Sequence, residues 1–281
     1  PRHGTRKDLS MTHLPPPYGL PRAPSTKAIA PADMLQTETL QEALQSLKAA
    51  IEGRTSAVVT GDSGCGKTCL LRALEEDLPQ GRYRLHYVHN ATVNRRDFYR
   101  QLSIGMGLEP HSSFAALHAS ISTHIQELAS QHKLRVIIVL DEAHLLSIQV
   151  LEQLHILLNF EKDSKPWLSL ILLGLPDLRE TLKRNVRASL TARVPIRIHL
   201  QPLDADQVKV YIRHRMNTAG CRREVFSDDA LLLMSKATGG IMRRLDVLGD
   251  QCLIAALKSK SNIVDAAVVQ KAIQVCGEAI Q

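Results

Sequence analysis

Apolar residues recur along the chain at two different spacings, and these spacings predict most of its secondary structure. Mostly apolar runs of strand length occupy Ser56–Thr60, Arg135–Leu140 and Leu168–Leu173. Tyr83–His89 and Val194–Leu200 instead alternate apolar with polar residues, which is the period of a strand. The sequence therefore predicts five short strands.

Residues at helical spacing fill the intervals between these strands. Leu40, Leu44, Leu47 and Ile51 recur three or four residues apart, and Gly53 follows them as a stop signal. The same spacing predicts a helix that ends near Leu78 and helices over Asn94–Gly105, with Asn94 as N-cap, Phe114–His132 and Leu145–Leu158. Strands that alternate with helices indicate a parallel sheet with both faces covered.

The two ends of the chain differ from this middle part. Prolines from Pro15 to Pro31 crowd the first 35 residues, which show little apolar periodicity. After Pro202 the predicted elements are all helical: Asp204–Thr218, Ser227–Ala237, Met242–Lys258 and Val264–Val275. We therefore predict three parts: a Pro-rich arm over residues 1–35, an α/β nucleotide-binding domain over 36–201 and a small helical lid domain over 202–281.

The composition is that of an ordinary globular protein, with 44% hydrophobic and 22% charged residues in a chain of 281. No apolar run approaches the roughly 20 residues of a membrane span, and the first thirty residues lack the apolar core of a signal peptide. The five cysteines show no CxxC pair, so we expect reduced thiols and a cytoplasmic protein without a membrane partner. The formal net charge of +7 is compatible with binding to nucleic acid or to an acidic membrane surface.

The segment that reads GDSGCGKT carries the strongest chemical signal, because it fits the G-x-x-x-x-G-K-[ST] pattern of a phosphate-binding loop. A predicted strand precedes it and a helix follows, as phosphate binding by backbone N–H groups and a helix N-terminus requires. Lys67 is expected to reach the terminal phosphates of ATP, and the Thr68 hydroxyl to bind Mg²⁺. The residues predicted to hold the nucleotide are Gly61, Asp62, Ser63, Gly64, Cys65, Gly66, Lys67, Thr68 and Cys69.

Two carboxylates, Asp141 and Glu142, end the strand Arg135–Leu140, which we expect to lie close to the first strand. Asp141 is placed to hold Mg²⁺, and Glu142 to orient and deprotonate the attacking water. His144 completes the letters D-E-A-H, but one such domain cannot make the two-domain cleft of DEAH helicases. A helix-start role suits His144 better than catalysis.

Arginines supply candidates for stabilising the transition state. Arg193, just before the last strand, is predicted to point into a neighbouring subunit's nucleotide in a ring or filament. Arg184 and Arg187 are alternatives for this role in trans. From the lid domain, Arg243 is predicted to contact the γ-phosphate, with its neighbour Arg244 as a competitor.

With these residues in hand, the chain resembles a bacterial AAA+ family that includes ExeA-type ATPases and the TnsC- and MuB-like transposition regulators. The resemblance runs from about Tyr18 to the C-terminus. Besides the phosphate loop, it rests on Tyr18-Gly19-Leu20 with Pro24, Asp141-Glu142-Ala143-His144-Leu145-Leu146, Leu157-Leu158-Asn159-Phe160-Glu161, Gly174-Leu175-Pro176-Asp177-Leu178 and Thr238-Gly239-Gly240. It implies a P-loop AAA+ sheet followed by an all-α lid.

The resemblance also implies a DNA path and one departure from the usual catalytic set. The segment Asn90–Arg96 is similar to the region that touches the DNA backbone in TnsC-like filaments, so Asn94, Arg95 and Arg96 are candidate DNA-binding residues. Many AAA+ proteins carry a polar residue at the end of the strand Leu168–Leu173. Here Gly174 follows, so that role is empty or moves to Asn159, and we expect slow hydrolysis.

Three functions fit this family. The first is an ATP-dependent regulator of DNA transposition, which assembles with ATP on double-stranded DNA as a homo-oligomer, a ring or helical filament, and disassembles on ATP hydrolysis. It would recruit and activate a separate transposase, with a target-selector protein as a further possible partner. The second is an assembly ATPase of a secretion system, as in the ExeA type. The third is an ATPase similar to replication initiators or clamp loaders.

Overall fold

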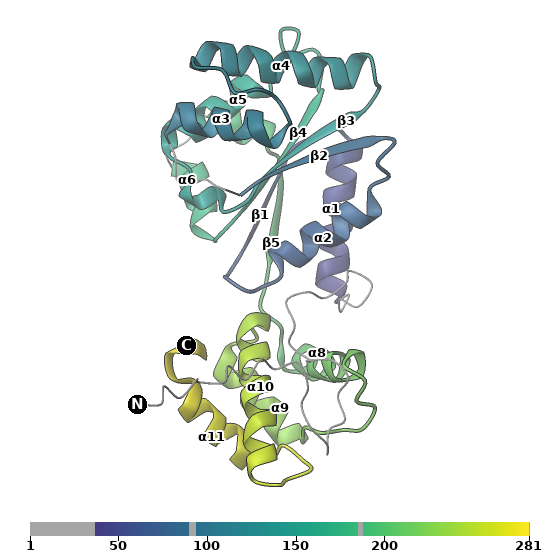
Figure 1. The fold of residues 1–281 in the computed structure, drawn as a ribbon, viewed down its shortest axis with the longest axis vertical. Helices are drawn as coiled ribbons and strands as arrows, with labels where there is room; N and C mark the ends of the chain where they lie inside the picture. Colours follow the sequence, from purple (N-terminus) through teal and green to yellow (C-terminus); the bar gives the residue numbers. More distant parts are fainter. Residues whose placement is uncertain (1–36, 90–93, 185–187, 281) are drawn as a thin grey trace, which may run out of the picture. The chain divides into compact units, whose positions relative to one another are not determined.

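The computed structural model describes residues 37–89, 94–184 and 188–280 (Figure 1). These residues form two compact units, divided between Gln201 and Pro202. The predicted Pro-rich arm, residues 1–35, lies outside the described residues.

The first unit is built on a parallel sheet of five strands, which confirms the predicted fold class. The strands are β1 (Ala57–Gly61), β2 (Tyr83–Val88), β3 (Arg135–Leu140), β4 (Leu168–Gly174) and β5 (Ile196–Leu200). Their order across the sheet is β2-β3-β4-β1-β5, and every neighbouring pair is parallel. The strand that ends at Asp141 is therefore not beside β1, because β4 lies between them.

Helices cover both faces of this sheet, and Figure 1 shows α1 and α2 on one side with α3, α4 and α6 on the other. The helical segments of this unit are α1 (Glu38–Glu52), α2 (Lys67–Asp77), α3 (Arg95–Gly105), α4 (Phe114–Ser130), the 3₁₀ turn η2 (Ala143–Leu145), α5 (Ile148–Leu157), α6 (Asp177–Arg184) and α7 (Ala188–Arg193). Phe98 of α3 and Ile121 of α4 pack with Ile138 of β3 in one fully buried cluster. Each such side chain stabilises the fold by about 1.5–3 kcal/mol relative to an exposed position.

Most helix starts follow from capping residues in the sequence. The side chains of Thr37, Asn94, Ser113 and Ser147 each accept a hydrogen bond from a backbone N–H in the first turn of their helix. Such a cap is worth about 1 kcal/mol, because those N–H groups have no partner within the helix. The helix predicted from Leu145 therefore begins only at Ile148, after the Ser147 cap.

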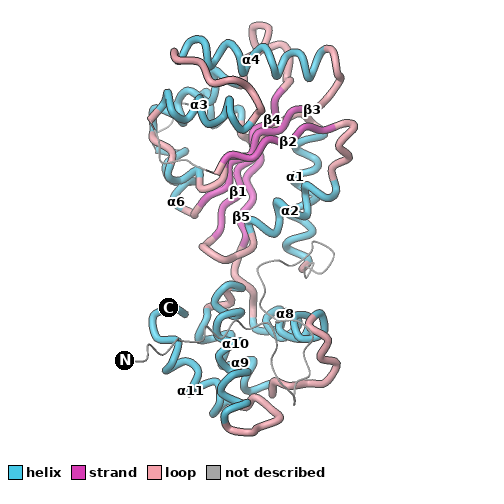
Figure 2. Tube along the Cα trace, viewed as in Figure 1, coloured by secondary structure: helices cyan, strands magenta, loops and turns pink. Residues whose placement is uncertain are grey.

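The second unit is helical, and Figure 2 shows helix and loop but no strand in it. Its segments are α8 (Ala205–Thr218), α9 (Asp228–Thr238), α10 (Met242–Lys258), α11 (Ala266–Cys276) and the 3₁₀ turn η3 (Gly277–Ile280). Val208, Leu231, Leu245 and Val269, one from each α-helix, are buried in a shared core. A single isolated β-bridge between Phe226 and Val264 is the only strand-like pairing in the described part of this unit.

Candidate nucleotide-binding site

The phosphate loop connects β1 to α2 and depends on glycine for its shape. Gly64 and Gly66 have φ values of 93° and 94°, in the left-handed region that favours glycine. Gly66 is also the N-cap of α2, so the first N–H groups of this helix border the loop. Asp62, Ser63 and Thr68 are exposed, whereas Cys65 is buried and Cys69 half-buried. The predicted residues thus form the loop and the first turn of α2, with the side chains of Asp62, Ser63 and Thr68 at the surface.

Lys67, the first residue of α2, is almost completely buried, with 8% of its surface exposed. Its ammonium group donates hydrogen bonds to the carbonyl oxygens of Gly61, at 2.7 Å, and Asp62, at 3.1 Å. A buried ammonium is costly unless such acceptors surround it. The loop therefore holds a positive charge against its own backbone, where phosphate oxygens would be bound.

The two predicted carboxylates lie at the same edge of the sheet as this loop. Asp141 follows β3 directly, and the carboxyl ends of parallel strands share one edge. Asp141 is buried, and its Oδ1 accepts a hydrogen bond from the Glu142 N–H at 2.8 Å. Its Oδ2 accepts one from the Tyr87 hydroxyl at 2.7 Å. Sequence reasoning missed Tyr87, although its place near the end of β2 was a usable signal.

Glu142 is held in a strained backbone conformation, with φ 52° and ψ 36° in the left-handed region. A non-glycine residue in this region costs of order 1–3 kcal/mol and is found most often at functional sites. The Glu142 side chain is 40% exposed, so water can reach its carboxylate. Its Oε2 lies 3.5 Å from Nδ1 of His144. The strain thus places the predicted general base at the surface of the site.

The end of β4 packs tightly against the turn that contains these groups. The Leu175 N–H donates a hydrogen bond to His144 Nδ1 at 3.3 Å. A Cβ atom on Gly174 would lie only 3.2 Å from the His144 backbone nitrogen and 2.9 Å from the Leu178 side chain. A side chain at position 174 would therefore require the Leu178 side chain and the His144 backbone to shift, and the His144 imidazole already lies beside this position. Asn159, the other candidate for that role, is exposed just after α5.

The oxygen ligands at this edge fit Mg²⁺. Asp141 offers a carboxylate and Thr68 a hydroxyl, while Mg²⁺ usually takes one or two such protein ligands and fills the rest of its octahedron with water and phosphate oxygens. Among the described residues, no group of three or more His, Cys, Asp or Glu side chains could hold a metal ion. The Asp141 carboxylate and the Thr68 hydroxyl are the two protein oxygens that would hold Mg²⁺ here.

Comparison with known proteins relates the part of the chain that contains this site to a known family. Residues 50–182 match the model of a family described as AAA domain. Residues 50–182 therefore form a domain similar to the AAA family. Its fold is similar to solved AAA+ structures: Cdc6p from Pyrobaculum aerophilum (17% identity, 90% of this chain and 70% of that chain, TM-score 0.70), Drosophila ORC bound to DNA (19%, 99% and 71%, TM-score 0.65), and the RuvB branch migration motor of Thermotoga maritima (17%, 86% and 70%, TM-score 0.57).

A curated relative extends this similarity beyond the AAA domain. General secretion pathway protein A of Aeromonas hydrophila is 31% identical over 264 residues, which cover 92% of this chain. The same alignment covers 48% of the relative, so the chain spans about half of its length. In the described part of the chain, no helix has the length and apolar character needed to cross a membrane.

The Arg193 side chain is bonded to two groups of its own chain. Arg193 Nη1 donates to the His155 carbonyl at 2.9 Å, and Nη2 pairs with Asp163 Oδ2 at 2.6 Å. Asp163 belongs to a turn in which Glu161, Lys162 and Asp163 all have positive φ values, of 47°, 58° and 68°. Arg193 precedes β5, whose first residue pairs with the first residue of β1, so it lies at the edge opposite the phosphate loop. Within one subunit the structure does not bring it to the nucleotide.

The other predicted arginines have different surroundings. Arg184 is 77% exposed and lies 3.5 Å from Glu180, whereas Arg187 lies outside the described residues. Arg243 and Arg244 are in the first turn of α10, in the helical unit. Arg184 is thus the more accessible of the two described candidates for a role in trans.

The candidate DNA-binding residues begin α3, and the structure separates them by their contacts. Asn94 caps the helix by accepting a hydrogen bond from the Asp97 N–H at 3.0 Å. The Arg95 guanidinium lies 4.4 Å from the centre of the Phe114 ring, a cation–π distance. Arg96 is exposed, and so is Arg100 one helical turn later, which sequence reasoning left out although the four-residue spacing indicates a shared face. Residues 90–93 of the predicted loop lie outside the described residues.

Proposed function

We propose that this protein binds MgATP and hydrolyses it to ADP and phosphate at the carboxyl edge of β1 and β3. The observation that carries the proposal is the shared edge, which joins the buried Lys67 ammonium to the carboxylates of Asp141 and Glu142. Lys67 would bind the β- and γ-phosphates, while Thr68 and Asp141 would hold Mg²⁺. The ion would neutralise charge that develops on the phosphate oxygens.

In this proposal Glu142 performs the proton transfer. Its carboxylate accepts a proton from a water molecule as the water oxygen bonds to the γ-phosphorus and the bond to the β-phosphate oxygen breaks. The Leu175 N–H holds His144, whose imidazole packs beside Glu142. Gly174 offers no polar side chain to the water, which supports slow turnover that depends on a neighbouring subunit. That subunit would supply Arg193 or Arg184 to the nucleotide. From the helical unit, Arg243 would contact the γ-phosphate.

We propose further that ATP assembles the protein on double-stranded DNA, in a homo-oligomer that recruits a transposase in the cytoplasm. What supports this proposal is the motif set shared with TnsC- and MuB-like regulators, the net charge of +7 and the exposed arginines on α3. A second candidate is assembly of a secretion machine, which the name of the Aeromonas relative favours.

Sedimentation with duplex DNA separates the two candidates. The wild-type protein, with ATP and Mg²⁺, is expected to pellet with long duplex DNA and to remain in solution with ADP. Lys67→Ala should stay in solution with either nucleotide, while Lys48→Ala, which removes an exposed lysine paired with Asp77, should behave as wild type. ATP binding without any ATP-dependent sedimentation on DNA would reject the transposition proposal and favour the secretion machine.

A further inference from the structure

The carboxylate of Asp141 is held by a group from a neighbouring strand. Strand β2 pairs with β3, and Tyr87 is in register with Val139, two residues before Asp141. From this position the Tyr87 hydroxyl donates to Asp141 Oδ2 at 2.7 Å, while the backbone N–H of Glu142 occupies Oδ1. These two bonds fix the direction in which the buried carboxylate faces. Because a carboxylate has about four acceptor sites, both oxygens can still accept further hydrogen bonds.

The Tyr87 hydroxyl keeps its proton under physiological conditions. An ordinary tyrosine hydroxyl ionises only at about pH 10. Tyr87 is therefore a neutral hydrogen-bond donor, and it leaves the negative charge of Asp141 in place for a cation.

A second ring supports the phenol from the solvent side. The His89 and Tyr87 rings are stacked, with centres 6.1 Å apart and planes inclined by 17°. His89 Nδ1 lies 3.3 Å from the Tyr87 hydroxyl and 3.8 Å from Asp141 Oδ2, beyond hydrogen-bond distance from the carboxylate. Because the His89 side chain is 68% exposed, its cation–carboxylate attraction is weakened by solvent. Tyr87 is thus the side chain that orients Asp141.

We propose that Tyr87 is a positioning residue for magnesium: its hydroxyl holds Asp141 in the orientation that binds Mg²⁺ or its water. This inference rests on the proposed function, since it concerns the same MgATP site. Hydrogen-bond partners that orient a metal's carboxylate ligand are typically worth 10- to 100-fold in metal affinity or activity. We therefore expect Tyr87 to set the Mg²⁺ concentration at which the protein binds ATP tightly.

The test is equilibrium binding of a fluorescent ATP analogue across a series of Mg²⁺ concentrations, with the full chain. Tyr87→Phe keeps the ring and removes the hydroxyl. We expect it to raise the Mg²⁺ concentration for half-maximal tight binding by about tenfold. Binding in EDTA should be unchanged, and high Mg²⁺ should restore tight binding, which a damaged fold would not allow. Tyr83→Phe, the same change at the other end of β2, is the control and should match wild type.

Two outcomes would overturn the inference: an unchanged Mg²⁺ midpoint in Tyr87→Phe, or an equal loss of binding with and without Mg²⁺. If Tyr87→Phe melts well below wild type, replacing Tyr87 by 4-aminophenylalanine decides, because it keeps both the ring and a donor. A wild-type midpoint in that protein supports the inference, and the midpoint of Tyr87→Phe contradicts it. Failure of the proposed function is distinguishable, since wild-type binding would then not depend on Mg²⁺ at all.

Discussion

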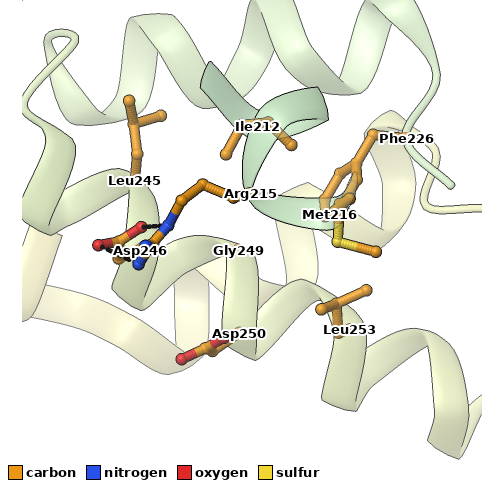
Figure 3. A pocket seen from close by; sticks show the side chains of 9 residues that line it. All are labelled: Ile212, Arg215, Met216, Phe226, Leu245, Asp246, Gly249, Asp250 and Leu253. Atoms are coloured by element: carbon orange, nitrogen blue, oxygen red, sulfur yellow. Dashed lines mark hydrogen bonds and ion pairs between the residues drawn. The ribbon is translucent and has the colours of Figure 1, made fainter. Parts of the chain in front are cut away.

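Each unit of the molecule contains an aspartate bound by a tyrosine hydroxyl, and the two pairs differ in whether an arginine also binds the carboxylate. Asp141 is buried, and the Asp246 side chain is 25% exposed. In the helical unit, Tyr211 donates to Asp246 at 2.9 Å. Arg215 adds two bonds, at 3.2 Å and 3.1 Å, which Figure 3 shows. In the AAA domain, Tyr87 donates to Asp141 at 2.7 Å. No arginine or lysine of the described residues forms an ion pair with Asp141.

The difference separates a charge that the fold neutralises from one that it leaves for a ligand. Arg215 is 6% exposed along its side chain, and Figure 3 shows it reaching across from α8 to Asp246 on α10. Burial raises the pKa of Asp246 above its usual value, against the opposing effect of Arg215, so that carboxylate needs its cation from the protein. Asp141 has the same kind of donor but no such cation. An open negative charge beside a phosphate loop is what a Mg²⁺ site requires.

The largest effect, on ATP hydrolysis, is expected from substituting Glu142, the exposed carboxylate next to Asp141. Glu142→Gln keeps Lys67, Thr68 and Asp141, so MgATP should still bind. An amide cannot accept the proton of water, so hydrolysis should fall by roughly 10²- to 10⁴-fold, the usual worth of a positioned general base. Phosphate release in single-turnover assays measures the loss, with exposed Glu127→Gln as control. Hydrolysis at the wild-type rate would mean that another residue is the base.

Removing the Arg215–Asp246 ion pair should lower stability and not affect hydrolysis. Arg215→Ala leaves the half-buried Asp246 without its cation, which should cost about 3 kcal/mol of the free energy of unfolding, the low end of the range for a buried pair. Arg213→Ala removes a half-exposed arginine paired with Glu224 and should cost below about 1 kcal/mol. Denaturant melts of the helical unit's transition give both values. Equal costs for the two substitutions would show that the Arg215–Asp246 pair stabilises the helical unit no more than the Arg213–Glu224 pair does.

Substitutions at Arg193 and Asp163 test whether an arginine that is bonded within its own chain also acts on the nucleotide of a neighbouring subunit. Losing its bonds to His155 and Asp163 should cost about 1.5–3 kcal/mol in Arg193→Ala, the usual value of a hydrogen bond that involves a charged group. Asp163→Asn weakens the same contact but keeps the guanidinium. If Arg193 acts in trans, Asp163→Asn should retain DNA-stimulated hydrolysis, measured as phosphate release, while Arg193→Ala loses it. Loss in both would indicate a purely structural arginine and direct attention to Arg184.

The smallest effect is expected at α3, where Arg95 lies over the Phe114 ring and Arg96 is exposed. Each lost phosphate contact should lower the slope of log affinity against log salt by about 0.9 on duplex DNA. Arg96→Ala should show this change, and Arg95→Ala a smaller one, because Arg95 lies over Phe114. Fluorescence anisotropy at several salt concentrations measures both slopes. An unchanged slope in the double variant would place the DNA path elsewhere.

The strands and the phosphate loop were predictable because their signals are local. Apolar runs predicted three strands and apolar–polar alternation the other two, all to within two residues. The spacing of Gly61, Gly66, Lys67 and Thr68 identified the loop. The short helices α6 and α7 were missed, since neither is long enough to show a helical period.

Contacts between distant segments could not be predicted in the same way. Tyr87 and Asp141 are 54 residues apart and meet only because β2 and β3 pair. The bond from Arg193 to Asp163 similarly depends on a turn with three positive φ values, which no motif indicates. Sequence patterns therefore located the chemical groups, but they did not show which charges the fold itself neutralises.

The most direct test of this distinction is to remove both carboxylates in turn and measure two properties of each variant. Asp141→Asn should abolish the effect of Mg²⁺ on ATP affinity and leave the free energy of unfolding within about 1 kcal/mol of wild type, because the amide can keep the Tyr87 bond. Asp246→Asn should keep the Mg²⁺ effect and lose about 3 kcal/mol, because Arg215 is left without its counter-ion. A Mg²⁺ effect that survives in Asp141→Asn, or one that disappears in Asp246→Asn, would contradict the account.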